Sequence, residues 1–216
     1  MIYLDYSATT PANKEVVDAF SKVSLDYVGN PNSLHKLGVD AKKLMDAACM
    51  QVADLLVVKS NEVIFTSGAS EANNTAIMGV VEKYPNRGKH IITTKLEHSS
   101  VLECMNYLEN IGYIIDYVNI NEDGLIDLNH LKSLLSKDTV LVSICHVNSE
   151  VGIKQNINEI GKILKNYPTT IFHVDGTQAV GKIPVNLEDV DLYSFSAHKF
   201  FGLKGVGCLI KKNNIE

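Results

Sequence analysis

Short apolar runs alternate with longer amphipathic stretches along most of the chain. Seven runs rich in β-branched and aromatic residues predict strands at 62–66, 90–93, 113–118, 139–145, 170–174, 190–195 and 206–210. Apolar residues that recur every three or four positions predict helices between most of them, at about 69–84, 98–111, 127–136 and 156–166. This alternation favours an α/β fold of three layers (α/β/α), in which helices cover both faces of a mainly parallel seven-stranded sheet.

Two further helical patterns precede the first predicted strand. Apolar residues recur at steps of three and four from 16 to 27 and again from 37 to 55. Ser33 lies in a turn cluster between them and is a candidate helix cap. Because no repeat, low-complexity segment or linker interrupts the sequence, we expect residues 1–216 to form one continuous unit.

Composition narrows the classes of partner. The chain has 216 residues and a formal net charge of -5, which gives no general attraction for nucleic acid or anionic lipid. No stretch approaches the roughly 20 apolar residues of a membrane span, and the N-terminus does not resemble a signal peptide, so we expect a cytoplasmic protein without a membrane partner. The four cysteines form no C-x-x-C pair and the histidines no zinc-hydrolase motif, so no metal is expected.

Polar side chains follow most of the predicted strands. The carboxyl ends of parallel strands meet at one edge of a sheet, where ligands bind. The candidates at this edge are His98, Asn148, Asp175, Gln178, Ser196, His198 and Lys199. Together they predict one polar pocket, although a single such residue is more often a loop residue or a helix cap.

The residue types in this pocket are those that a pyridoxal phosphate enzyme needs. A turn of small residues at 67–70 leads into a predicted helix whose N-terminus suits a phosphate, and Ser70 adds a hydroxyl. A carboxylate such as Asp175 can keep the pyridine nitrogen protonated, and a lysine such as Lys199 can carry the cofactor covalently. The pattern therefore predicts pyridoxal 5'-phosphate as the cofactor.

The motifs resemble those of the cysteine desulfurases, which belong to the class V aminotransferases among the fold-type I pyridoxal phosphate enzymes. The matching segments, in the order of the family, are YLDYSATTP (3–11), GNPNSLHKLG (29–38), FTSGASEANN (65–74), LEHSSVL (96–102), HVNSEVG (146–152), HVDGTQAVGK (173–182) and SFSAHKFFGLKGVG (194–207). They cover almost the whole chain. The resemblance implies that residues 1–216 are an N-terminal segment plus the cofactor-binding large domain of a pyridoxal-phosphate-dependent transferase.

The resemblance also implies a role for each residue of the pocket. Lys199 would carry the cofactor and move protons, and His98 would stack over the ring and assist proton transfer. Asp175 would pair with the pyridine nitrogen, Gln178 would bond the ring hydroxyl, and Asn148 would contact the cofactor and the substrate carboxylate. The residues implied to hold the phosphate are Ala69, Ser70, Ser196, Ala197 and His198.

This sequence departs from the family pattern at several positions. Ser70 stands where Thr is usual, Gly176 where Ala is common, Ala197 where Gly is common and Leu203 where Pro is common. Family members also continue well beyond the position of Glu216. We therefore expect the small C-terminal domain to be absent from this chain, together with the loop of the persulfide cysteine and the arginine that binds the substrate carboxylate.

The implied activity converts L-cysteine to L-alanine and transfers the sulfur as a persulfide for iron–sulfur cluster assembly. The implied partners are L-cysteine, a second copy in a homodimer, and a sulfur-acceptor or iron–sulfur scaffold protein. Two alternatives stay open: a catalytically silent module that binds pyridoxal phosphate or acts as a scaffold, and a selenocysteine lyase or another class V aminotransferase. This chain alone is expected to be inactive.

Overall fold

The computed structural model describes residues 2–216 and confirms the predicted order of elements. The helices are α1 (Lys14–Asp26), α2 (Lys36–Leu56), α3 (Ala69–Lys83), α4 (Ser99–Asn110), α5 (Leu128–Leu134) and α6 (Ile157–Leu164), with short 3-10 helices η1 (Ser60–Glu62) and η2 (Ala197–Lys199). The strands are β1 (Val63–Thr66), β2 (His90–Thr93), β3 (Ile114–Tyr117), β4 (Thr139–Cys145), β5 (Ile171–Asp175), β6 (Leu192–Ser196) and β7 (Gly207–Lys211).

The seven strands form one sheet in the order β1-β7-β6-β5-β4-β2-β3. Strands β3, β2, β4, β5 and β6 pair in parallel, whereas β7 is antiparallel to both of its neighbours. The register pairs Cys145 with Asp175 and Asp175 with Ser194, so the carboxyl ends of β4, β5 and β6 lie side by side. The loops that follow these strands therefore open onto the same edge of the sheet.

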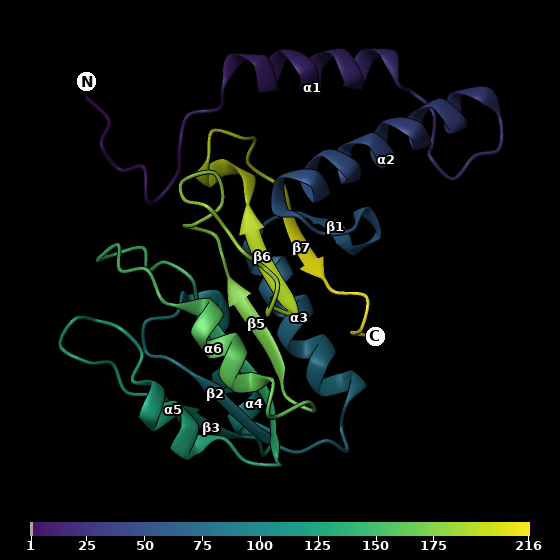
Figure 1. Cartoon of the computed structure of the whole chain (residues 1–216). Coiled ribbons are helices and arrows are strands. Elements are labelled where there is room, and N and C mark those ends of the chain that lie inside the picture. The colour runs from purple at the N-terminus through teal and green to yellow at the C-terminus, as the bar shows by residue number, and fades with distance from the viewer. Residues whose placement is uncertain (1) are drawn as a thin grey trace.

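Helices cover both faces of the sheet, as the alternation of elements predicts (Figure 1). Successive strand residues point to opposite faces, and neighbours such as Leu141 and Val142 accordingly enter two different cores. One core lies under α3 and α4, and the other lies under α5, α6 and the last turns of α2. The sheet is thus a rigid base for the loops at its carboxyl edge.

The N-terminal region lies largely outside these cores. Within the described residues no residue of α1 is buried, although its apolar residues recur at helical spacing. Figure 1 shows α1 at the edge of the molecule, away from the sheet. The cap predicted at Ser33 is wrong, because the N-cap of α2 is His35, two residues later, and its Nδ1 accepts from the Gly38 N–H at 3.3 Å. No helix among residues 2–216 is long and apolar enough to cross a membrane.

Candidate active site at the carboxyl ends of the strands

A cavity of about 540 Å³ lies where the loops after β4, β5 and β6 meet the start of α3. Every residue predicted for the pocket except Ala197 lines it, and the N-terminal residues Asp5, Ser7 and Ala8 close one side. Ala197 stands at the start of η2, where its N–H donates to the carbonyl of Val206 at 3.0 Å. The sequence therefore locates the cavity, but not the N-terminal segment that completes it.

Lys199 faces that N-terminal segment. Its Nζ donates to the carbonyl oxygens of Ser7 at 2.6 Å and of Ala8 at 2.9 Å. Burial lowers the pKa of Lys199, while the carboxylates of Asp175 and Asp5 act in the opposite direction. A lowered pKa makes the neutral, nucleophilic amine more accessible, as a lysine that forms a covalent link with a carbonyl group requires.

The segment is itself fixed to the loop that carries Lys199. Thr10 donates from its N–H and from Oγ1 to the carbonyl of His198, at 2.8 Å and 2.9 Å, and its Oγ1 accepts from the Phe201 N–H. The hydroxyl of Thr9 lies 3.1 Å from Nδ1 of His198. These contacts join parts of the chain about 190 residues apart in sequence, a link that no local pattern predicts.

Asp175 ends β5 and lies buried at the base of the cavity. Its Oδ1 accepts from the Thr177 N–H at 3.0 Å, and its Oδ2 accepts from Nδ2 of Asn73 at 2.8 Å. A carboxylate offers about four lone-pair positions, so two acceptor positions stay available for a ligand. Asn73 was not singled out from the sequence, although it lies within the FTSGASEANN motif.

The start of α3 forms the opposite part of the cavity. Gly68, which has no side chain, occupies its N-cap, and the Ala69 N–H donates to Oγ of Ser196 at 2.6 Å. The first N–H groups of a helix and its dipole favour an anion, and Ser70 and His198 line the cavity beside them. Burial lowers the pKa of His198, and the positive charges of Lys199 and Lys204 add to the effect.

Two amide side chains line the cavity and shape its wall. Gln178 donates from Nε2 to the carbonyl of Ser7 at 2.8 Å and accepts at Oε1 from Nζ of Lys182 at 2.6 Å. Asn148 donates to the carbonyl of Leu96 at 2.9 Å, and its Oδ1 accepts from two backbone N–H groups of the loop after β4. Both amides thus hold the loops of the cavity in place.

His98 caps the N-terminus of α4. Its Nδ1 accepts from the Ser100 N–H at 3.1 Å and lies 2.9 Å from the Ser100 hydroxyl. The cap fixes the direction of the imidazole at the edge of the cavity, which its ring lines.

Glu97 is a buried acid directly behind the cavity wall. Its Oε1 accepts from the Thr94 hydroxyl at 2.7 Å and from the Cys145 N–H at 2.9 Å, whereas its buried Oε2 has no hydrogen-bond partner among residues 2–216. Burial raises the pKa of Glu97 to about 8, and the charge of Asp175 adds to the effect. Glu97 is therefore mostly a neutral acid at pH 7.

Gly176 explains one departure from the family pattern. A Cβ at this position would overlap the ring of Tyr193, whose hydroxyl lies 2.9 Å from Nδ1 of the buried His146. The large side chain on β6 and the glycine after Asp175 therefore fit together, and the alanine that is common in the family would not fit here.

All four cysteines are free, and none has the setting of a reactive thiol. Cys104, Cys145 and Cys208 are buried and Cys49 is half-buried. Burial raises the pKa of Cys208 to about 12 and also raises that of Cys104 and Cys145. Thiols held protonated in this way are poor nucleophiles. This agrees with the expectation that they are core residues.

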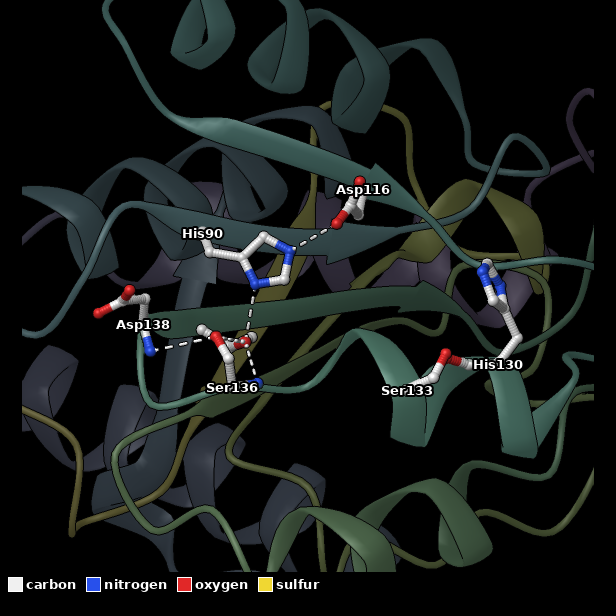
Figure 2. Close-up of polar contacts among 7 residues, drawn as sticks. His90, Asp116, His130, Ser133, Ser136 and Asp138 are labelled. Atoms are coloured by element: carbon white, nitrogen blue, oxygen red, sulfur yellow. Dashed lines mark hydrogen bonds and ion pairs between the residues drawn. The ribbon is translucent and has the colours of Figure 1, made fainter.

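A second polar cluster lies at the opposite end of the strands (Figure 2). His90 begins β2, and its ring nitrogens lie 2.8 Å from Oγ1 of Thr139 and 3.1 Å from Oδ2 of Asp116. Thr139 is fully buried and its hydroxyl also accepts from the Ser136 N–H. No substrate can reach that hydroxyl, so Asp116, His90 and Thr139 do not form a catalytic triad. Their hydrogen bonds instead join β2, β3 and β4.

Known proteins resemble this chain in both sequence and structure. The family model described as "Aminotransferase class-V" matches residues 2–216. Cysteine desulfurase IscS of Buchnera aphidicola subsp. Acyrthosiphon pisum (strain 5A) is 50% identical over 213 residues, which cover 96% of this chain and 52% of that protein. A solved structure described as a NifS-like protein superposes with a TM-score of 0.96 at 40% identity, covering 99% of this chain and 60% of that one.

Another solved structure, described as SspA in complex with cysteine, has a TM-score of 0.94 at 34% identity and covers 99% of this chain and 62% of its own. The chain spans about half the length of the curated relatives it matches.

Proposed function

The chain belongs to the class V aminotransferase family, and from this premise we propose that it is the pyridoxal-phosphate-binding part of a cysteine desulfurase. The observation that carries the proposal is the convergence of three groups on one cavity. These are the amine of Lys199, the buried carboxylate of Asp175 and the start of α3. They belong to three separate stretches of the chain, and no other feature of the sheet requires them to meet.

The residues present fit pyridoxal phosphate. The cofactor has an aldehyde, a pyridine nitrogen and a phosphate, and the cavity offers an amine, a carboxylate and a helix N-terminus. The free lone-pair positions on Asp175 suit a protonated ring nitrogen. A volume of about 540 Å³ lies within the usual range for sites that hold small molecules.

Each predicted residue keeps its role in the proposal. Ala69, Ser70, Ser196 and His198 would surround the phosphate, and Ala197 would contribute through the turn that joins Ser196 to His198, because its own N–H donates to Val206. Asp175 would hold the ring nitrogen, and Gln178 and Asn148 would contact the ring and the substrate. When bound, pyridoxal phosphate supplies an electron sink that stabilises negative charge on a substrate carbon.

The chain's own groups supply binding and proton transfer. Lys199 must leave the carbonyls of Ser7 and Ala8 before its amine can react, and its lowered pKa makes loss of the proton easier. His98 stands at the edge of the cavity where it can exchange a proton with a bound substrate. The buried carboxyl group of Asp175, with two acceptor positions free, would hold a protonated ring nitrogen.

The proposed substrate is L-cysteine, with L-alanine as product and a persulfide as the carrier of sulfur toward iron–sulfur clusters. The relatives described as cysteine desulfurases and the neighbour described in complex with cysteine support this choice. We place residues 1–216 in the large domain of a cytoplasmic homodimer, which passes sulfur to an acceptor or scaffold protein. The persulfide cysteine would belong to a segment outside this chain, because its own cysteines have raised pKa values or lie partly in the core.

The test is product analysis with two substrates. We would express the longest product of the reading frame that contains this chain, add pyridoxal phosphate, and measure the alanine formed from L-cysteine and from L-selenocysteine. The proposal predicts alanine from cysteine and none from the 216-residue chain alone. Alanine from selenocysteine only would indicate a selenocysteine lyase, and cofactor binding with neither substrate consumed would indicate a silent module; either result contradicts the proposal.

A further inference from the structure

A chain of hydrogen bonds behind the cavity connects Asp175 with His98. Asn73 of α3 is fully buried between them, and its Nδ2 donates to Oδ2 of Asp175 at 2.8 Å and to Oγ of Ser100 at 3.0 Å. Oγ of Ser100 lies 2.9 Å from Nδ1 of His98. We propose that Asn73 is a positioning residue that acts through Ser100 to hold neutral His98 in the tautomer with its hydrogen on Nε2.

The backbone fixes the first part of this assignment. The Ser100 N–H donates to Nδ1 of His98 at 3.1 Å. A ring nitrogen that accepts a hydrogen bond does not carry a hydrogen, and neutral imidazole has only one N–H. The hydrogen of neutral His98 therefore lies on Nε2.

Asn73 determines what the Ser100 hydroxyl does. That hydroxyl has a single hydrogen, and its oxygen already accepts from Nδ2 of Asn73. With Nδ1 of His98 2.9 Å away, its hydrogen is directed at that nitrogen and adds a second donor to the same acceptor. Without Asn73, the hydroxyl could rotate and accept from His98 instead, which would favour the opposite tautomer.

The orientation of the Asn73 amide is set by Asp175. If the amide were turned over, its Oδ1 would face Oδ2 of the carboxylate, and two acceptors would repel each other at hydrogen-bond distance. In the observed orientation both amide hydrogens are used, while the buried Oδ1 finds no partner among residues 2–216. An unpaired buried acceptor is unfavourable, so its presence indicates that the two donated bonds decide the placement of this residue.

The inference rests on the proposed function for its chemical use. With Nδ1 engaged by Ser100, His98 meets a bound molecule with an N–H at Nε2 and acts first as a donor. Because Asn73 also bonds Asp175, the group that would hold the ring nitrogen and the group that would stack over the ring are oriented by one buried side chain. The tautomer itself belongs to the chain and exists without a cofactor.

The test is nitrogen NMR of the histidine rings in the chain prepared without cofactor. At about pH 8, above the ordinary histidine pKa of about 6.5, the shifts of Nδ1 and Nε2 report which nitrogen carries the hydrogen. His98→Gln identifies the His98 signals by their loss. In the wild-type chain we expect Nε2 to resonate as a protonated nitrogen and Nδ1 as an unprotonated, hydrogen-bonded one.

Variants separate positioning from general stability. Ser100→Ala and Asn73→Ala should each move the Nδ1 resonance toward that of a nitrogen without a hydroxyl donor, and the double variant should move it no further than Ser100→Ala does. Gln155→Ala is the matched control, because Gln155 is a buried amide that bonds Gly124 and Ile126 away from the cavity. It should leave the His98 signals unchanged.

Two results would overturn the proposal: a hydrogen on Nδ1 in the wild-type chain, or Nδ1 shifts that stay at the wild-type value in the variants that fold. If Asn73→Ala does not fold, Asn73→Ser takes its place as the test of Asn73, while Ser100→Ala tests the donation from the Ser100 hydroxyl to Nδ1. Since no cofactor is present, a failure of pyridoxal phosphate binding cannot be mistaken for a failure of this inference.

Discussion

Replacing Glu97 with Gln should change how the stability of the protein depends on pH. Gln has the shape of the neutral acid, so its Oε1 can still accept from Thr94 and from the Cys145 N–H. Its NH₂ group replaces the buried Oε2, which has no partner among the described residues. We therefore expect a destabilisation of about 1–3 kcal/mol at acidic pH from the unpaired donors.

The pH dependence comes from the difference between the folded and unfolded pKa. Burial raises the pKa of Glu97 from its ordinary 4.5 to about 8 in the folded protein. Between these values the unfolded chain is ionised and the folded chain is protonated, so the folded state binds more protons and the free energy of unfolding falls as pH rises. Each pH unit removes about 1.4 kcal/mol, which amounts to about 3 kcal/mol between about pH 5.5 and about pH 8.

The assay is urea unfolding at a series of pH values, followed by far-UV circular dichroism because the chain has no tryptophan. The difference between wild type and Glu97→Gln removes the contributions of other groups. It should favour the wild type near pH 5.5 and shrink by about 3 kcal/mol, or change sign, near pH 8. A difference that stays constant over this range would refute the reasoning, because Glu97 would then titrate alike in both states.

Glu62 is the matched control. It is also buried, and burial acts to raise its pKa, but the N–H groups of Lys59 and Asn213 and the charge of Lys212 lower it overall. A carboxylate with a lowered pKa contributes stability above its unfolded pKa and loses it as pH falls through the folded value. The free energy of unfolding of the wild type relative to Glu62→Gln should therefore not fall between pH 5.5 and 8. At acidic pH this difference should change with pH in the opposite sense to that for Glu97→Gln.

Three further substitutions test the packing and one buried titratable group. Gly176→Ala should lower the free energy of unfolding by about 1–3 kcal/mol, because the added Cβ overlaps the Tyr193 ring. Gly79→Ala should raise it by about 0.5–1 kcal/mol, because a Cβ at this position of α3 meets nothing within 4 Å. Urea unfolding of both variants measures the contrast, and equal effects would contradict it. Burial lowers the pKa of His173 to about 4, although Asp175 opposes it, so the folded state binds fewer protons than the unfolded chain and stability should fall by about 3 kcal/mol between about pH 6.5 and about pH 4. His173→Gln should remove this part of the acid sensitivity, and an unchanged slope would show that His173 titrates normally.

The fold could be predicted from the sequence because short runs of apolar residues mark strands that are buried on both faces, and apolar residues at steps of three and four mark the helices. β4 is predicted at 139–145 and observed at Thr139–Cys145, and α3 is predicted at 69–84 and observed at Ala69–Lys83. Strand ends are less certain, since Asp175 is predicted to follow β5 and is in fact its last residue. The position of Asp175 at the carboxyl edge, which the site needs, is the same in either case.

The parts of the candidate site that side chains form could be predicted from the sequence, whereas the parts that backbone groups form could not. Lys199, Asp175 and His98 stand out as polar residues after strands, and the structure brings them to one cavity. The carbonyls of Ser7 and Ala8 could not be predicted, because every residue has a carbonyl and only the path of the chain places these two beside Lys199.

Two other groups, Glu97 and Asn73, could not be predicted because their roles depend on burial and on contacts between distant parts of the chain. The protonation of Glu97 depends on how deeply the loop before α4 is buried, and Asn73 reads in sequence as one of two adjacent asparagines on a helix. The cap at His35 in place of Ser33 was also not predicted, because histidine is not among the residue types that usually cap helices.

The link between pyridoxal phosphate and Lys199 is the central claim, and covalent trapping tests it most directly. The chain is incubated with pyridoxal phosphate and reduced with borohydride, which makes the link between the cofactor and its lysine permanent, and the labelled peptide is identified by mass spectrometry. Lys182→Ala is the matched control, because Lys182 bonds Gln178 near the cavity and its loss should leave the label in place. The account predicts the label on Lys199 in both chains, and a label on any other lysine, or none at all, would contradict it.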